Sequence, residues 1–155
     1  MSRVGLPGLS DMQPRAIILE DDHSLRQLLS GVLESKGYEV VSASDPTICP
    51  IYANLQGICP HEFACGDFLL TDNRMPRMSG LEFVQAQTQR GCKGVVQNKA
   101  ILSATWTDED LQTAMQLGCK IFTKPYRFAE IHQWLDEQAT KIPADRKLDD
   151  LSTIL

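Results

Sequence analysis

The sequence of 155 residues lacks long apolar segments and clusters of basic residues. No apolar stretch approaches the roughly 20 residues that a membrane span requires, so we expect no membrane partner. Acidic side chains outnumber basic ones by 20 to 15, and without a basic cluster we expect no direct binding of nucleic acid. Repeats and low-complexity segments are also missing, while 43% of the residues are hydrophobic, which indicates one globular core.

Residues 1–13 contain no apolar block, and a secretory signal is therefore not expected. We expect a cytoplasmic protein, in which thiols stay reduced. The five cysteines are an odd number, which also argues against a disulfide framework. Buried free thiols that pack as small hydrophobic side chains are the simplest interpretation of these residues.

Short apolar runs alternate with amphipathic segments along most of the chain. Such apolar runs are typical of strands buried on both faces, as in a parallel sheet between two layers of helices. The leucine stripe over 25–33, in contrast, repeats at helical spacing and is followed by Gly37. The alternation predicts an α/β fold with a doubly wound, five-stranded parallel sheet flanked by helices. The predicted strands are 16–19, 38–41, 68–71, 100–102 and 121–123, and the predicted helices are 25–33, 51–55, 81–89, 107–117 and 128–141.

Three segments fall outside this alternation. Residues 1–14 are rich in Gly and Pro and are predicted to form a flexible leader before a domain at 15–141. Within that domain, residues 44–66 are irregular and contain three prolines and three cysteines. The tail, 142–155, carries four apolar side chains that either dock on the domain or stay mobile: Leu148, Leu151, Ile154 and Leu155.

Polar side chains stand where four of the predicted strands end. In open parallel sheets, ligands bind beyond the carboxyl ends of the strands, near the point where the strand order reverses. If the first, third, fourth and fifth strands are neighbours, these side chains gather in one small space. They are Glu20, Asp21 and Asp22 after the first strand, Asp72 after the third, Ser103 after the fourth and Lys124 after the fifth.

This set of side chains suits phosphoryl transfer. Carboxylates that lie close together raise one another's pKa unless a cation is present, and Mg²⁺ fits because it takes oxygen ligands and keeps several waters. The carboxylate nearest the open side can then act as a nucleophile and form an acyl phosphate. The Lys124 ammonium and the Ser103 hydroxyl can meet phosphoryl oxygens, and such positioning is most of what the reaction needs.

Four pieces of the sequence together resemble the receiver domain of two-component response regulators. The most specific piece is the Asp-x-x-Met-Pro-x-Met-x-Gly stretch at 72–80. The others are Ile-Ile-Leu-Glu-Asp-Asp at 17–22, Ile-Leu-Ser-Ala at 101–104 and Phe-Thr-Lys-Pro-Tyr at 122–126. The order and spacing of these pieces extend the resemblance over about residues 14–140. The resemblance implies a flavodoxin-like receiver fold and a phosphorylation-dependent signalling switch of a two-component phosphorelay.

The resemblance also implies a role for each site residue. Asp72 is the implied phosphoacceptor, Ser103 the implied switch hydroxyl and Lys124 the implied phosphate-binding lysine. Ile121 falls where the family often has a switch aromatic residue, and Phe122 is the alternative for that role. The implied Mg²⁺ ligands are Asp21, Asp72, the backbone carbonyl of Arg74 and, mainly through water, Glu20.

The partners implied by the resemblance are other signalling proteins. The phosphodonor would be a sensor histidine kinase, a phosphotransfer protein or a small acyl phosphate. The domain would phosphorylate and dephosphorylate itself, and the sequence contains no motif for turnover of a separate substrate, so an enzyme is not expected. The output would be altered binding of an unnamed downstream protein, self-association as a homodimer, or control of a domain outside this sequence.

A second hypothesis concerns the irregular segment, where three thiols and one imidazole fall within 17 residues: Cys49, Cys59, His61 and Cys65. Their spacing matches no standard zinc pattern such as two CxxC knuckles. These four side chains can bind one soft metal ion only if the loop folds back. As an alternative, two of the thiols form a redox-sensing pair. On this hypothesis a receiver-like scaffold carries a metal-binding or redox-sensing module.

Overall fold

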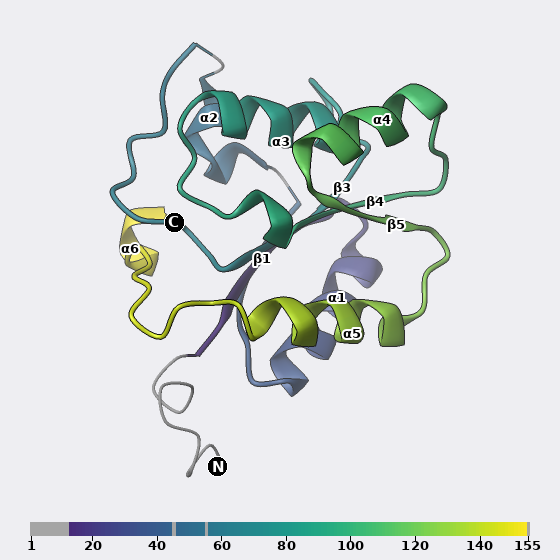
Figure 1. The fold of residues 1–155 in the computed structure, drawn as a ribbon. Helices are drawn as coiled ribbons and strands as arrows, with labels where there is room; N and C mark the ends of the chain where they lie inside the picture. Colours follow the sequence, from purple (N-terminus) through teal and green to yellow (C-terminus); the bar gives the residue numbers. More distant parts are fainter. Residues whose placement is uncertain (1–12, 45, 55, 155) are drawn as a thin grey trace.

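One five-stranded parallel sheet lies between two layers of helices, which confirms the fold class expected from the sequence (Figure 1). The computed structural model describes residues 13–44, 46–54 and 56–154, so the predicted leader and Leu155 fall almost entirely outside the described residues. The strands are β1 (Arg15–Leu19), β2 (Glu39–Ala43), β3 (Phe68–Asp72), β4 (Lys99–Ser103) and β5 (Lys120–Thr123). The α-helices are α1 (His23–Ser35), α2 (Pro50–Ala53), α3 (Gly80–Gln89), α4 (Asp108–Leu117), α5 (Phe128–Ala139) and α6 (Leu151–Ile154), with 3-10 turns η1 (Pro46–Ile48) and η2 (Val96–Asn98).

The strand order is β2-β1-β3-β4-β5, so the order reverses where β1 and β3 lie side by side. All pairings are parallel, with Ile18 opposite Leu70 and Thr71 opposite Ile101, for example. The carboxyl ends of all five strands therefore lie at one edge of the sheet. This order meets the condition under which the polar side chains at the strand ends become neighbours.

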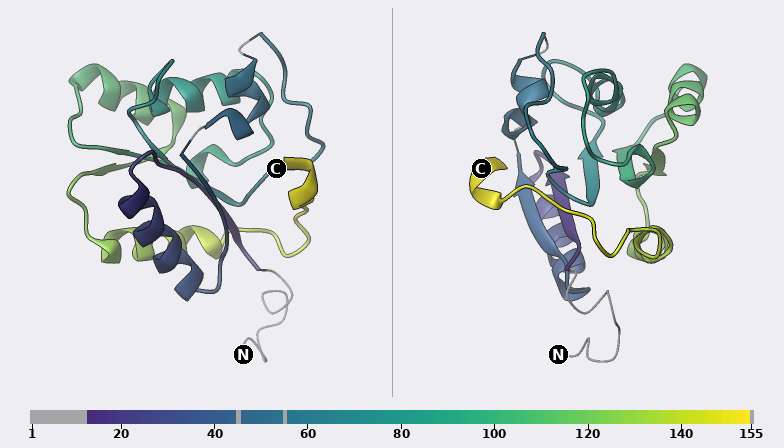
Figure 2. Two further views of the ribbon diagram at one scale, coloured as in Figure 1. Left: turned by 180° about the vertical axis from the view of Figure 1, so that it is seen from behind. Right: turned by 60° about the vertical axis from the view of Figure 1, so that its left-hand side comes forward.

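Two hydrophobic clusters, one on each face of the single sheet, form the core and hold the helices in place (Figures 1 and 2). Helices α1 and α5 cover one face, where Leu33 and Trp134 belong to one buried cluster. Helices α2, α3 and α4 cover the other face, where Phe83 belongs to a second cluster. Successive side chains of β3 alternate between them, because Phe68 lies in the first cluster and Leu69 in the second. No helix within the described ranges is long and apolar enough to cross a membrane.

Local signals in the sequence begin and end the helices. Asp22 accepts a hydrogen bond from the backbone N–H of Leu25 and so caps α1. Ser79 and Thr107 form capping boxes at the starts of α3 and α4. Gly118 ends α4 with a φ of 85°, a left-handed conformation that glycine adopts without strain. Several helices therefore begin a few residues after the strand ends that carry the polar side chains.

The C-terminal residues dock on the domain, which is one of the two alternatives open for the tail (Figure 2). The guanidinium of Arg146 donates two hydrogen bonds to the Asp67 carboxylate, at 2.8 and 2.7 Å. A carboxylate oxygen of Asp149 lies 2.7 Å from His61 Nδ1, and Ile154 is buried. The tail thus covers the irregular segment that precedes β3.

Gly80 is required where α3 begins, because a Cβ atom there would lie 2.6 Å from the backbone oxygen of Asp72. We expect Gly80→Ala to lower the free energy of unfolding by about 1–3 kcal/mol, since two backbone segments must move apart. Gly31 of α1 is the matched control, because a Cβ atom there meets nothing within 4 Å. Gly31→Ala should raise the free energy of unfolding by about 0.5–1 kcal/mol. Urea titration followed by circular dichroism measures both, and a Gly80→Ala protein as stable as the wild type would contradict this account.

Candidate functional site

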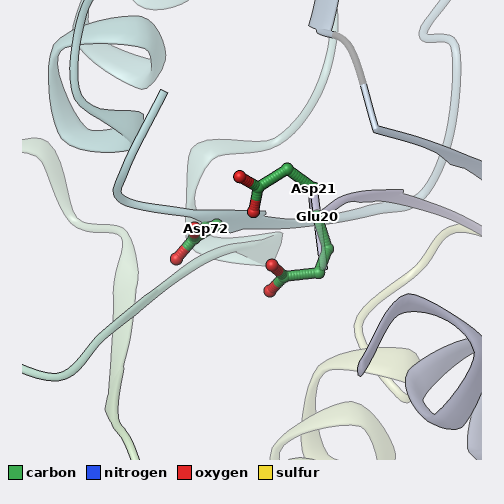
Figure 3. Close-up of side chains that lie close together, drawn as sticks. All are labelled: Glu20, Asp21 and Asp72. Atoms are coloured by element: carbon green, nitrogen blue, oxygen red, sulfur yellow. The ribbon is translucent and has the colours of Figure 1, made fainter. Parts of the chain in front are cut away.

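Three carboxylates meet at the carboxyl edge of the sheet (Figure 3). Glu20 and Asp21 directly follow β1, and Asp72 is the last residue of the neighbouring strand β3. The three side chains each offer a ligand oxygen, and these oxygens all lie within 4.8 Å of one another. Among the residues that the structure describes, no other set of three or more His, Cys, Asp or Glu side chains is so arranged. One cation can therefore contact all three carboxylates.

The donor set fits Mg²⁺. All three side chains offer carboxylate oxygens, which this hard cation prefers, and Mg²⁺ needs only a few of them because it keeps several waters. Glu20 and Asp72 are buried, whereas Asp21 is exposed, so the group is open to solvent on one side. That open side leaves room for water ligands and for an incoming phosphoryl group.

Lys124, the first residue after β5, completes the group. Its ammonium nitrogen lies 2.9 Å from Asp72 Oδ1 and 3.5 Å from Glu20 Oε1. The lysine side chain is about a quarter exposed, so its charge acts on the carboxylates with less screening than at a fully exposed site. The structure thus brings together the acidic residues and the lysine that sequence analysis singled out.

Burial and charge shift the protonation of two of these residues. Burial raises the pKa of Glu20 above its ordinary value, and the negative charge of Asp72 raises it further. A hydrogen bond from the backbone N–H of Asp22 and the charge of Lys124 oppose this effect. Burial alone would lower the pKa of Lys124, but the hydrogen bond to Asp72 and the charges of Asp72 and Glu20 raise it overall. Lys124 therefore stays charged, but its single positive charge does not neutralise the negative charge of the three carboxylates.

Two residues that sequence analysis missed position the acidic side chains. Arg26, in α1, donates a hydrogen bond to the backbone oxygen of Glu20 at 2.7 Å. Asn73 accepts backbone hydrogen bonds from Gly80 and Leu81 and donates its own N–H to Leu102, which ties the loop after Asp72 to α3 and β4. Neither residue carries a periodic signal. The hydrogen bonds of the folded chain reveal the roles of Arg26 and Asn73.

Ser103 lies at the same edge but is turned toward its own loop. It is the last residue of β4 and is buried, and its hydroxyl donates to the backbone oxygen of Thr105 at 2.8 Å. The two candidates for the switch position differ, because Phe122 is buried against Trp134 whereas Ile121 packs on the cluster under α3 and α4. Of the two, Ile121 is therefore the residue on the face of the sheet that α3 and α4 cover.

Two further residues border the site. Arg74, whose backbone carbonyl is a predicted ligand, follows Asn73 in the loop after β3 and has an exposed side chain. Tyr126, which sequence analysis did not single out, has a buried hydroxyl without a hydrogen-bond partner in the described part of the chain. Burial raises the pKa of Tyr126, and the charges of Glu20 and Asp72 raise it further. Its phenol therefore stays protonated near the carboxylates.

The second predicted set, at Cys49, Cys59, His61 and Cys65, does not form a preassembled metal centre. Within 46–54 and 56–67, no three of its ligand atoms come as close together as those of the acidic group. The Nδ1 atom of His61 instead pairs with Asp149. All five cysteines are free, as the simplest interpretation of the sequence predicted, but they are half-buried and not fully buried.

The family follows from comparison with known proteins. The model of the family described as "Response regulator receiver domain" matches residues 16–136. The chain belongs to this family. The resemblance predicted from the sequence is thereby confirmed, and this receiver domain is a phosphorylation-dependent signalling domain of a two-component system. Mg²⁺ binding at an acidic pocket is a general feature of receiver domains, and the three carboxylates described above form an acidic cluster in this chain.

Solved structures and a curated relative resemble this receiver domain. The chemotaxis response regulator CheY4 of Vibrio cholerae is 26% identical with a TM-score of 0.59, over 82% of this chain and 99% of that one. The beryllofluoride-activated NtrC4 receiver domain dimer is 16% identical with a TM-score of 0.63, over 82% and 97%, and shows the fold alone. YcbL, an uncharacterized transcriptional regulatory protein of Bacillus subtilis (strain 168), is 24% identical over 118 residues. That match covers 74% of this chain but only 46% of YcbL.

The raised pKa of Glu20 predicts a pH dependence of stability in metal-free protein. Glu20 binds its proton more tightly in the folded state, so the wild type loses stability as the pH rises from the ordinary carboxyl pKa through the raised one. The glutamine of Glu20→Gln does not titrate, so this variant does not lose stability in that way. The difference in free energy of unfolding between Glu20→Gln and the wild type should therefore grow as the pH rises toward 7. Urea titrations at a series of pH values measure the difference.

The exposed Glu62 provides the control for this prediction. Glu62→Gln should follow the pH dependence of the wild type. Saturating Mg²⁺ should remove the advantage of Glu20→Gln, since the ion supplies the missing positive charge. A constant difference between Glu20→Gln and the wild type at all pH values would contradict the proposed crowding of negative charge.

Proposed function

We propose that Asp72 of this receiver domain accepts a phosphoryl group and that the phosphorylated domain binds its partners differently. The observation that carries the proposal is the 2.9 Å contact between Lys124 Nζ and Asp72 Oδ1 within a group of three carboxylates. A purely structural ion pair needs one carboxylate for one ammonium. The excess of carboxylates on a side open to solvent is what a site for a cation and a phosphoryl group requires.

In this mechanism one oxygen of the Asp72 carboxylate is the nucleophile. It forms a bond to phosphorus while the bond from phosphorus to the leaving group breaks. The leaving group is the imidazole nitrogen of a phosphohistidine, or the carboxylate oxygen of a small acyl phosphate. The Lys124 ammonium, already within hydrogen-bond distance of Asp72, holds one phosphoryl oxygen as a point charge.

The neighbouring acidic residues hold the metal ion of this proposal. Mg²⁺, when bound, adds positive charge beside the phosphoryl oxygens. The residues that would hold it are Asp21, Asp72 and the backbone carbonyl of Arg74, with Glu20 acting mainly through water. Glu20 is buried, and its carboxylate accepts a hydrogen bond from the backbone N–H of Asp22 at 3.1 Å, which holds the carboxylate in place.

Ser103 and Ile121 carry the signal outward in this proposal. A phosphoryl oxygen on Asp72 competes with the backbone oxygen of Thr105 for the Ser103 hydroxyl, which now donates to Thr105 at 2.8 Å. Turning that hydroxyl toward the phosphoryl group moves the loop that leads into α4. Ile121 packs beneath the helices of the same face and follows this movement.

The proposed partners are a sensor histidine kinase or a phosphotransfer protein as donor and a downstream protein as receiver of the signal. Self-association is a further route, since the NtrC4 receiver domain to which the fold is similar is described as a dimer. The chain spans less than half the length of YcbL, so the activity and partners of a longer protein also belong to this proposal. Turnover of a separate substrate is not part of it.

Intact-protein mass spectrometry after incubation with acetyl phosphate tests the proposal. We expect the wild type to gain one phosphoryl group when Mg²⁺ is present and none when it is removed. Asp72→Asn should gain none under either condition, because the amide is not a nucleophile toward phosphorus. Circular dichroism confirms that the variant is folded.

Asp108, an exposed carboxylate in the first turn of α4, offers the matched control. Asp108→Asn should be phosphorylated as fast as the wild type. Equal phosphorylation of Asp72→Asn and wild-type protein would show that the acceptor is another residue, and the proposed function would then be wrong.

A further inference from the structure

Four of the five cysteines line one apolar cavity on the side of the sheet covered by α2 and α3. The cavity measures about 60 Å³, and its polar or sulfur-bearing lining includes Cys49, Cys59, Cys65, Cys92, Lys99 and His61. None of the acidic residues or the lysine of the phosphorylation site lines it. The cavity therefore belongs to a different part of the molecule and needs its own explanation.

Lys99 is the unusual member of this lining. It is the first residue of β4 and only 4% exposed. Its ammonium donates to Gln87 Oε1 at 2.8 Å and to Cys92 Sγ at 3.3 Å. In the part of the chain that the structure describes, no carboxylate forms an ion pair with it. A buried ammonium without a counter-charge is costly, so an anion beside it is strongly favoured.

The Cys92 sulfur is placed to be that anion. It receives two donors, the Lys99 ammonium at 3.3 Å and the backbone N–H of Gly94 at 3.4 Å. A neutral thiol is a weak acceptor, whereas a thiolate is stabilised by a nearby ammonium. Gly94 permits this approach, because a Cβ atom there would lie 3.2 Å from Lys99 Cε and 3.5 Å from Cys92 Sγ. Cys92 is half-buried between the exposed residues Gly91 and Lys93, so small reagents can reach it.

Two other thiols of the cavity, Cys49 and Cys65, are disfavoured as thiolates. Burial raises the pKa of the Cys49 thiol. Burial, and then the charges of neighbouring thiols, raise that of Cys65 to about 12. Gln87 lies between Cys49 and the contact of Lys99 with Cys92. Its amide nitrogen lies 3.7 Å from Cys49 Sγ, and its amide oxygen accepts a hydrogen bond from the Lys99 ammonium. Cys49, a thiol with a raised pKa, is therefore connected through Gln87 to the contact between Lys99 and Cys92.

His61 adds an unused polar atom to the same cavity. Its side chain is 7% exposed, and its Nδ1 is paired with Asp149. Its Nε2 is buried and has no hydrogen-bond partner among the described residues. A small polar molecule that enters the cavity can satisfy this nitrogen, which an apolar ligand cannot do.

We propose that Cys92 is a redox-active thiolate that a hydroperoxide oxidises and that then forms a disulfide with Cys49. The sulfur of Cys92 attacks one peroxide oxygen, the O–O bond breaks, and a sulfenic acid forms while Lys99 gives a proton to the departing alkoxide or hydroxide. The Cys49 sulfur then bonds to Cys92, and the hydroxyl of the sulfenic acid leaves as water with the Cys49 proton. Two thiols lose two electrons in total, which the peroxide gains.

Alkylation of the folded, reduced chain with iodoacetamide tests the thiolate, with the rate at each cysteine read by peptide mass spectrometry. We expect Cys92 to react fastest, and Lys99→Met to slow it by about tenfold or more. Lys99→Arg, which keeps the charge, should restore most of the rate. Lys93→Met is the matched control, because Lys93 adjoins Cys92 and also lines the cavity but is exposed, so its loss should leave the rate within about twofold.

Oxidation with hydrogen peroxide tests the second step. Non-reducing peptide mapping should find a Cys49–Cys92 disulfide in the wild type and in Cys119→Ser, whose altered residue does not line the cavity. Cys49→Ser should instead accumulate a sulfenic acid at Cys92 that dimedone traps, and Cys92→Ser should form neither product. Equal alkylation of Cys92 in the wild type and in folded Lys99→Met, or a disulfide that excludes Cys92, would overturn the proposal.

Discussion

The attraction between the Lys124 ammonium and the carboxylates of Glu20 and Asp72 is the interaction on which the functional edge of this domain depends. It joins the ends of β1, β3 and β5, which lie far apart in the sequence. One ammonium does not balance three carboxylates whose oxygens lie within 4.8 Å of one another. Negative charge therefore exceeds positive charge at this edge of the folded domain. This excess favours the binding of a divalent cation, and the bound cation in turn favours the binding of a phosphoryl group.

The parallel sheet explains why these side chains meet at all. Because all strands run in one direction in the order β2-β1-β3-β4-β5, every strand ends at the same edge, and the acidic residues lie at the ends of the two strands where the order reverses. Gly80 then brings the start of α3 close to the backbone of Asp72, and Asp22 caps α1 directly after the acidic pair. The same local signals that begin the helices thus set the position of the carboxylates.

Signals that are local in the chain could be predicted from the sequence, and contacts between distant segments could not. The apolar runs at 16–19 and 68–71 and the leucine stripe at 25–33 are each local in the chain, and the structure forms β1, β3 and α1 there. The hydrogen bond from Asn73 to the backbone of Leu102 and the pairing of Arg146 with Asp67 join segments far apart in the chain and have no periodic signature. For the same reason the sequence drew attention to His61, Cys49, Cys59 and Cys65, whereas the structure adds Cys92 and Lys99, which lie outside that segment.

Calorimetric titration of the unphosphorylated chain with Mg²⁺ shows whether the carboxylates at this edge bind a metal ion together. We expect one ion per chain, with affinity reduced by about tenfold or more in Asp21→Asn, which removes a carboxylate charge from the site. Asp22→Asn should bind as the wild type does, because Asp22 caps α1 and asparagine caps equally well. Unchanged affinity in Asp21→Asn, or no binding by the wild type at millimolar Mg²⁺, would contradict the claim that the carboxylates at this edge share a metal ion.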